Sequence, residues 1–143
     1  MTDEATYTVI EFEGPRLPDA YKNMIYSKWL RSLRYGNDYF RIIRSDAYYE
    51  AYQRLVKTLT ASPDAIIRLA VLSDDHDVVL GWSCIRRAHI LDYVHVQRDQ
   101  RNQGIANSLV PIKDITTITH LTNTAASIWG SKYSKDISFN PFI

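Results

Sequence analysis

Apolar and polar residues alternate at the start of the chain and then give way to helical spacing. Residues 7–12 alternate in this way and predict a strand that ends at Gly14-Pro15. A helix is predicted from about residue 17 to residue 36, with one apolar face made by Tyr21, Ile25, Trp29 and Leu33. A second helix is predicted from residue 45 to residue 62, with an inward face made by Tyr48, Tyr52, Leu55, Val56 and Leu59.

Short apolar runs between polar turns predict three strands in the middle of the chain. They cover residues 66–72, 78–85 and 89–96, and the first two flank a hairpin turn at 73–77. A helix follows from about Asn102, then a strand at 115–121, a short helix at 123–133 and a last strand at 137–142. The order β-αα-βββ-α-β-α-β indicates an α/β (α+β) fold with four helices and a mixed, mostly antiparallel sheet of about six strands.

Length and composition limit the organisation of the chain. A chain of 143 residues suffices for one domain with a sizeable core, so we expect residues 1–143 to form a single domain. No apolar run approaches the roughly 18 residues of a membrane span, and the amino terminus lacks a secretory signal pattern. The one cysteine, Cys84, fits a reducing compartment, so we expect a cytoplasmic protein and an inert buried thiol.

Charge adds little to the functional picture. The net charge of +1 gives no case for nucleic-acid binding by the whole molecule. Basic residues are interleaved with aromatic residues in one segment, at Lys28, Arg31, Arg34, Arg41 and Arg44. Such a segment can face nucleic acid, but solvated helix faces are the favoured interpretation. The cluster Asp74-Asp75-His76-Asp77 is interpreted as a solvated hairpin tip, so no metal site is predicted.

The most informative stretch covers residues 91–110, with the sequence LDYVHVQRDQRNQGIANSLV. A strand here runs into a glycine-containing turn at a helix start, where backbone N–H groups and the positive end of the helix dipole are exposed. This arrangement favours a phosphate or pyrophosphate, and a glycine lets the backbone approach the anion closely.

The same stretch resembles the signature of the GCN5-related N-acetyltransferases, the GNAT superfamily. In that signature a strand ending in valine precedes Arg/Gln-x-x-Gly-x-Gly/Ala at a helix start; Val96 matches the valine, and Arg101, Gly104 and Ala106 match the motif. The resemblance implies a GNAT-like acyl-CoA-binding domain with acetyl-CoA as co-substrate. The cofactor-binding residues that it implies are Val94, His95, Val96, Arg101, Asn102, Gln103, Gly104, Ile105, Ala106 and Asn107.

The resemblance further implies acetyl transfer to an amine by direct attack, with no covalent enzyme intermediate. It makes Asp92 the first candidate for the general base, because many family members place a carboxylate there. His95 and His120 are alternatives, since an unperturbed imidazole titrates near neutrality. Strict alternation puts Asp92 on the same face as Val94. It puts Tyr93 and His95 on the opposite face, unless a bulge intervenes.

The last part of the chain departs from the family pattern. The family's general-acid tyrosine is expected at Gly130, counted from Asn123, so Tyr133 is the candidate that remains. This departure leaves open a non-catalytic CoA-binding or nucleic-acid-associated module. Room for only one final strand implies a trimmed lobe or one completed by a second subunit, hence a homodimer. The segments YSKWLRSLRYG and SFNPFI also resemble small acetyltransferase-like proteins of tailed phages. The acceptor stays unidentified.

Overall fold

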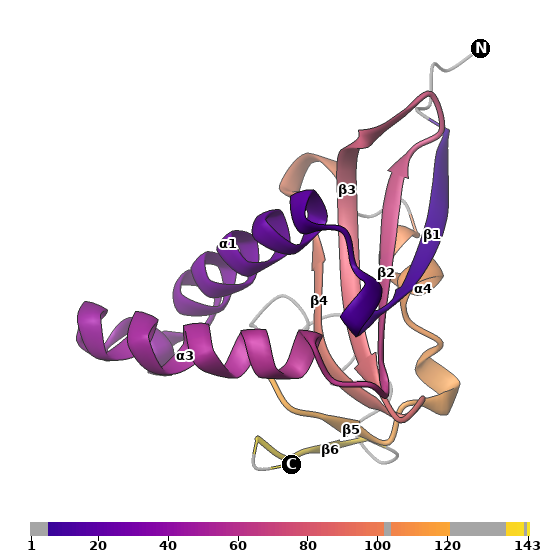
Figure 1. Ribbon diagram of the computed structural model, residues 1–143. Coiled ribbons are helices and arrows are strands. Elements are labelled where there is room, and N and C mark those ends of the chain that lie inside the picture. Colours follow the sequence, from indigo (N-terminus) through magenta and orange to yellow (C-terminus); the bar gives the residue numbers. More distant parts are fainter. Residues whose placement is uncertain (1–5, 102–103, 121–136, 142) are drawn as a thin grey trace.

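The computed structural model describes residues 6–101, 104–120, 137–141 and 143. One sheet runs through the molecule, with strands in the order β1-β2-β3-β4-β5-β6 (Figure 1). Its strands are β1 (Tyr7–Glu13), β2 (Ala65–Leu72), β3 (Asp75–Arg86), β4 (Ile90–Val96), β5 (Thr117–Ile118) and β6 (Ser138–Phe139). The helices are α1 (Asp19–Gly36), α2 (Asp38–Arg41), α3 (Ser45–Thr60) and α4 (Ile105–Leu109). β1 to β4 pair antiparallel, whereas β5 and β6 add in parallel.

The predicted fold class is confirmed: the described residues form a mixed, mostly antiparallel sheet of six strands with four helices. One described helix was not predicted from the sequence. α2 is an additional short helix, begun where the Asn37 side chain accepts a hydrogen bond from the Tyr39 backbone N–H at 2.9 Å. The helix predicted at 123–133 lies outside the described residues. Among the described helices, none has the length and apolar character needed to cross a membrane.

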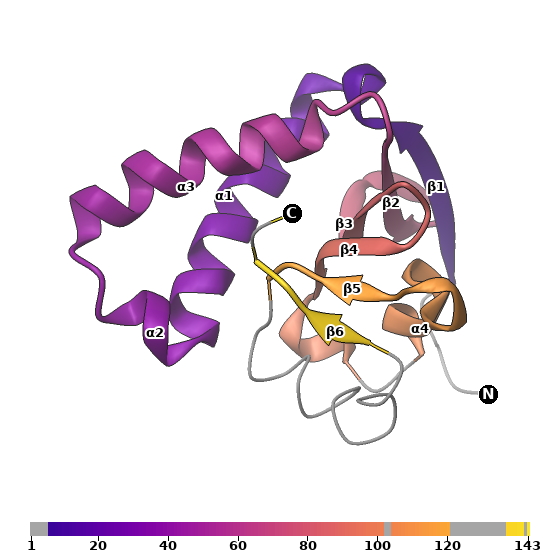
Figure 2. The ribbon, with the colours of Figure 1, turned by 90° about the horizontal axis from the view of Figure 1, so that it is seen from below.

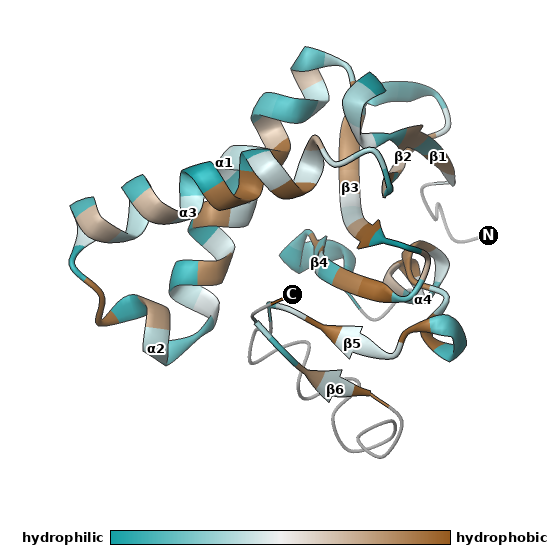
Figure 3. Cartoon of the chain, turned by 60° about the horizontal axis from the view of Figure 1, so that its bottom comes forward, coloured by the Kyte–Doolittle hydropathy of each residue, from teal (hydrophilic) through white to brown (hydrophobic). Residues whose placement is uncertain are grey.

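Each face of the sheet has its own apolar core. α1 and α3 cover one face, and α4 lies on the other (Figure 1). The first core is built on Trp29, Tyr48, Trp82 and Tyr93, which are at most 2% exposed. The second gathers Leu91, Ile105 and Leu109, among others, beneath α4. In Figure 3 the apolar colours accordingly gather on the strands and the inner helix faces. The predicted inward position of Leu55 is wrong, because this side chain is 37% exposed.

The pair of long helices reaches well past the sheet. Figure 2 shows α2 at the end of the pair farthest from the strands. At the other end, α3 is held against the chain after β1, because a Cβ at Gly14 would lie only 2.1 Å from the Thr60 carbonyl oxygen. The close approach requires glycine at position 14.

A bulge in β4 changes which side chains share a face. Ile85 pairs with Leu91 and Cys84 pairs with Tyr93, so Asp92 is an extra residue in β4. The bulge places the Asp92 side chain on the α1 and α3 face, beside Cys84 and on the same face as Tyr93. Strict alternation was therefore the wrong guide for Asp92, since it assumed a regular strand from residue 91 to residue 96.

Candidate functional site

The outer edge of β4 lacks a neighbouring strand over its last residues. Gln97 N–H donates to the Leu80 carbonyl at 2.8 Å, so in this antiparallel ladder the backbone groups of Val94 and Val96 point away from β3. β5 pairs only with Ile90 and Leu91. Among the described residues, no strand lies against the backbone of 94–96 on that side, and these groups are placed to pair with an extended ligand.

The turn after β4 folds back onto this edge. The Arg101 side chain donates through Nε to the Val96 carbonyl at 3.1 Å. A single 3-10 turn, Arg98–Gln100, makes the reversal possible. Gly104 then adopts a left-handed conformation with φ of 78°, and a Cβ built on it would meet no atom of the described residues within 4 Å, its chain neighbours apart. The Arg101 side chain therefore lies against Val96, and Gly104 is an exposed glycine directly before α4.

The helix that follows is shorter than predicted. α4 begins at Ile105 rather than near Asn102, and it ends at Leu109. Asn102 and Gln103 lie outside the described residues. A five-residue helix has a weak macrodipole, so the attraction for an anion must come mainly from first-turn N–H groups and from basic side chains. Of the residues implied for the cofactor here, Ile105 is buried, Ala106 is half-buried and Asn107 is exposed.

Basic side chains gather near His95. Burial, together with the positive charges of Arg101 and Lys28, lowers the pKa of His95 to about 4. The imidazole is therefore neutral at pH 7. Lys28 comes from α1, and no pattern in the sequence indicates that it lies near β4. The two cations show that this end of β4 is electropositive, which favours an anionic ligand.

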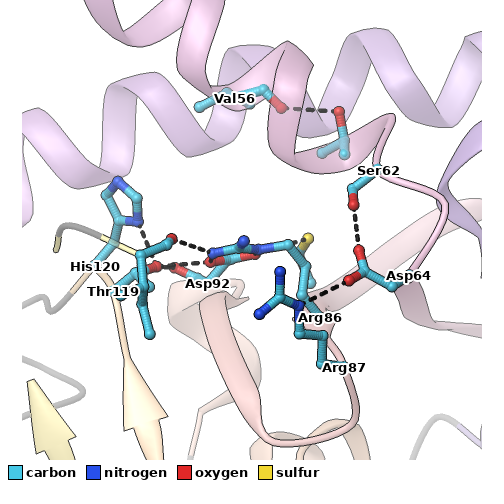
Figure 4. A network of polar contacts seen from close by, with 11 residues as sticks. Val56, Ser62, Asp64, Arg86, Arg87, Asp92, Thr119 and His120 are labelled. Atoms are coloured by element: carbon cyan, nitrogen blue, oxygen red, sulfur yellow. Dashed lines mark hydrogen bonds and ion pairs between the residues drawn. The ribbon is translucent and has the colours of Figure 1, made fainter. Parts of the chain in front are cut away.

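Asp92 is fully buried and its carboxylate is already paired. Arg86 donates from Nε to Oδ2 at 2.5 Å and from Nη2 to Oδ1 at 2.9 Å (Figure 4). Thr119 Oγ1 donates to Oδ1 at 2.8 Å. A carboxylate held by a guanidinium and a hydroxyl is well placed to position other groups, and both of its oxygens are engaged.

His120 lies next to this network, under α1 and α3. Its Nδ1 is 2.9 Å from Thr119 Oγ1, and its ring meets the Trp29 and Tyr52 rings edge-on. Burial lowers its pKa, an effect only partly offset by the charge of Asp92 and a hydrogen bond to the Asp92 backbone. The structure thus brings together Asp92 and His120, two residues that sequence reasoning had treated as separate alternatives.

Several other side chains near the site have structural roles. Tyr93 shares a hydrogen bond with Ser32 at 2.7 Å, and burial raises the pKa of its phenol. Burial also raises the pKa of the Cys84 thiol, which keeps it protonated and unreactive. Tyr133 lies outside the described residues. The buried indole N–H groups of Trp29 and Trp82 have no hydrogen-bond partner among the described residues.

Other features that the sequence singled out lie away from β4. Arg34 donates to the Ile43 carbonyl and stacks over Tyr48, while Arg41 and Arg44 pair with acidic neighbours. Most of the basic segment is thus engaged within the chain. Within the described part of the chain, no group of three or more His, Cys, Asp or Glu side chains could hold a metal ion.

Comparison of the sequence with protein-family models and with curated proteins finds no match. The structure, in contrast, is similar to solved structures. A Pyrococcus furiosus protein classed as an acetyl transferase superposes with a TM-score of 0.56 at 15% identity, over 89% of this chain and 91% of that chain. Aminoglycoside N-acetyltransferase AAC(6')-Iy, solved with CoA, gives a TM-score of 0.50 at 10% identity, over 94% and 89%.

At these identities the likeness concerns the fold. The chain therefore has a GNAT-like fold, as the residues from Val96 to Ala106 implied.

Proposed function

We propose that this protein binds acetyl-CoA and transfers the acetyl group to an amine acceptor. The observation that carries the proposal is the β4 edge at Val94 and Val96, along which no strand lies among the described residues and which leads into the exposed left-handed turn at Gly104. The coincidence of this geometry with the matched sequence motif supports the proposal. So does the CoA complex of a protein that shares the fold.

Different residues around the turn would bind different parts of the co-substrate. Backbone groups of Val94 and Val96 would pair with the amide-containing arm of the co-substrate, as a further strand would. First-turn N–H groups from Ile105 onward would face its phosphates, together with the side chain of Arg101. Gly104 leaves room for this approach, since nothing fills the space beside its Cα. Asn102, Gln103 and Asn107 complete the proposed set.

Chemistry at the bound thioester needs a proton acceptor for the amine. When bound, acetyl-CoA supplies the activated acetyl group, and no covalent bond to the protein is required. Asp92, His95 and Tyr133 are the candidates for proton transfer that the sequence indicates. His95 is neutral at pH 7, but the low pKa makes it a weak base.

A second candidate function is CoA binding without turnover. The observation that favours it is the ion pair of Asp92 with Arg86, which occupies the carboxylate at the position where the family resemblance places a base. This candidate and the first agree on the cofactor and differ on turnover, so one pair of measurements separates them.

The first measurement is thermal unfolding with acetyl-CoA, with free CoA and with ATP. A ligand at about 100 times its dissociation constant stabilises a protein by roughly 2.7 kcal/mol, so we expect an upward shift of several degrees with both CoA species. ATP should give no comparable shift. Absence of a shift with acetyl-CoA would remove both candidate functions.

The second measurement is release of free thiol from acetyl-CoA with a panel of amines, including polyamines, amino acids and protein amino groups. Arg101→Gln should weaken acetyl-CoA binding, because its side chain lies at the turn. Arg98→Gln is the matched control, since Arg98 is an exposed cation in the same turn. Binding without thiol release from any amine would favour the second candidate.

A further inference from the structure

The hydroxyl of Thr119 determines where the proton of His120 lies. Oγ1 has one proton and donates it to Asp92 Oδ1, which as an ion-paired carboxylate oxygen only accepts. Oγ1 must then accept the hydrogen bond at 2.9 Å from His120 Nδ1. The ring nitrogen Nδ1 therefore carries the proton, and in a neutral ring Nε2 keeps a lone pair.

Groups from four elements surround the ring and hold it in place. Asp92 from β4 acts through Thr119, and Arg86 from β3 balances the carboxylate charge. The rings of Trp29 from α1 and Tyr52 from α3 pack edge-on against the imidazole. Burial lowers the pKa of His120, which keeps the ring unprotonated at pH 7. His120 is 7% exposed, and its described hydrogen bonds are to Thr119 Oγ1, at Nδ1, and to the Asp92 backbone.

The position of His120 is the second observation. The last backbone hydrogen bond between β4 and β5 runs from Thr119 N–H to the Leu91 carbonyl at 3.1 Å. His120 is the next residue, so it lies where β5 leaves β4 and where the unpaired β4 edge begins. Figure 4 shows its ring directed away from the carboxylate and toward the helices.

We propose that His120 is the general base of the acetyl transfer, with Thr119 and Asp92 as positioning residues. The inference rests on the proposed function and adds the residue that moves the proton. Nε2 of His120 takes a proton from the amine as its nitrogen forms a bond to the thioester carbonyl carbon. The carbon–sulfur bond then breaks, and the imidazolium returns that proton to the leaving sulfur. The amine and the thioester thus become an amide and a free thiol.

The chain contains a matched control pair on the same two segments. His89 Nδ1 lies 3.1 Å from Thr116 Oγ1, and both residues precede the paired part of β4 and β5. His89 is exposed, and no carboxylate stands behind Thr116 among the described contacts. Variants of this pair remove the same chemical groups from the same strands without affecting the proposed relay.

The first test needs no turnover. Nitrogen NMR of the four histidines distinguishes a protonated from a bare ring nitrogen. At pH 7 we expect His120 as the Nδ1–H tautomer in the full-length protein, and a mixture of tautomers in Thr119→Val. Thr119→Ser keeps the hydroxyl and should restore the single tautomer. A proton found on Nε2 of the unaltered protein would overturn the inference.

The second test is kinetic. His120→Gln should lower kcat by about 100-fold or more, the range for loss of a general base, while acetyl-CoA binding is unchanged. Thr119→Val should lower kcat and shift the pH profile, and Thr119→Ser should restore both. His89→Gln and Thr116→Val should leave kcat unaltered. Full turnover in His120→Gln overturns the base assignment alone, whereas no turnover in the unaltered protein overturns the proposed activity and the assignment together.

Discussion

Arg86 donates two hydrogen bonds to the carboxylate of Asp92, at 2.5 and 2.9 Å. Asp92 is the extra residue of the bulge in β4, so it has no paired residue in β3. Asp92 is fully buried and the Arg86 side chain is only 11% exposed. The ion pair sits where β3, β4 and the residues after β5 meet, because Asp92 also accepts from Thr119. The three residues therefore link β3, β4 and the segment after β5.

Breaking this ion pair should be costly. Removal of one partner from a buried pair leaves an uncompensated charge, so Arg86→Met is expected to lower the free energy of unfolding by about 3–5 kcal/mol. Denaturant unfolding measures the change. Arg54→Met is the control, because the Arg54 and Glu50 side chains are 78% and 70% exposed and their pairing contributes at most about 1 kcal/mol. Equal costs for the two variants would contradict the assigned role of Arg86.

Substitutions of Gly104, the left-handed glycine of the turn, should change acetyl-CoA affinity and protein stability to different extents. Gly104→Ala introduces backbone strain of about 1–2 kcal/mol at φ of 78°, and its methyl group would occupy the space left for the ligand. Gly104→Asn should cost less stability, since asparagine tolerates this conformation, but should weaken acetyl-CoA binding more. Unfolding curves and titration calorimetry measure the two effects. Unchanged affinity in Gly104→Asn would place the ligand elsewhere.

Stability should depend on pH through His95. Its pKa is about 4 in the folded protein and near 6.5 when unfolded, so the unfolded chain binds more protons between these values. Stability is therefore retained above about pH 6.5 and falls as the pH drops toward 4. His120, with its lowered pKa, contributes in the same direction. His95→Gln should flatten the slope, as thermal unfolding across pH 4 to 7 will show; an unchanged slope would contradict the burial of His95.

Gly81 should tolerate no side chain. A Cβ there would lie 2.8 Å from the His95 carbonyl oxygen and 3.3 Å from a methyl group of Leu109. We expect Gly81→Ala to lower the free energy of unfolding by about 1–3 kcal/mol, because β4 or α4 has to move away from β3. Since the first contact is with the proposed ligand-binding strand, acetyl-CoA affinity should fall as well. Gly14→Ala is a control that perturbs stability far from β4 and should leave affinity unchanged.

Local sequence patterns predict most of the helices and strands but few of the contacts in the candidate site. The alternation and the fourfold spacing predicted β1, α1, α3 and the three central strands close to their observed limits. The predicted helix was longer than α4. The residues that follow the turn have a composition suited to a helix, but only five of them become helical. The bulge at Asp92 had no local signal, because it results from how β3 and β4 align over the two cores.

By itself the sequence determined the strand-turn-helix unit from Val94 to Ala106, because glycine at a left-handed position and an apolar strand are local requirements. It also determined the order of elements. Only the tertiary structure decided that Asp92 faces Arg86 and that Thr119 joins it to His120. Two of these contacts link residues that are 6 and 27 positions apart, on three segments of the chain, and their burial makes pairing obligatory. No spacing along the chain encodes that requirement.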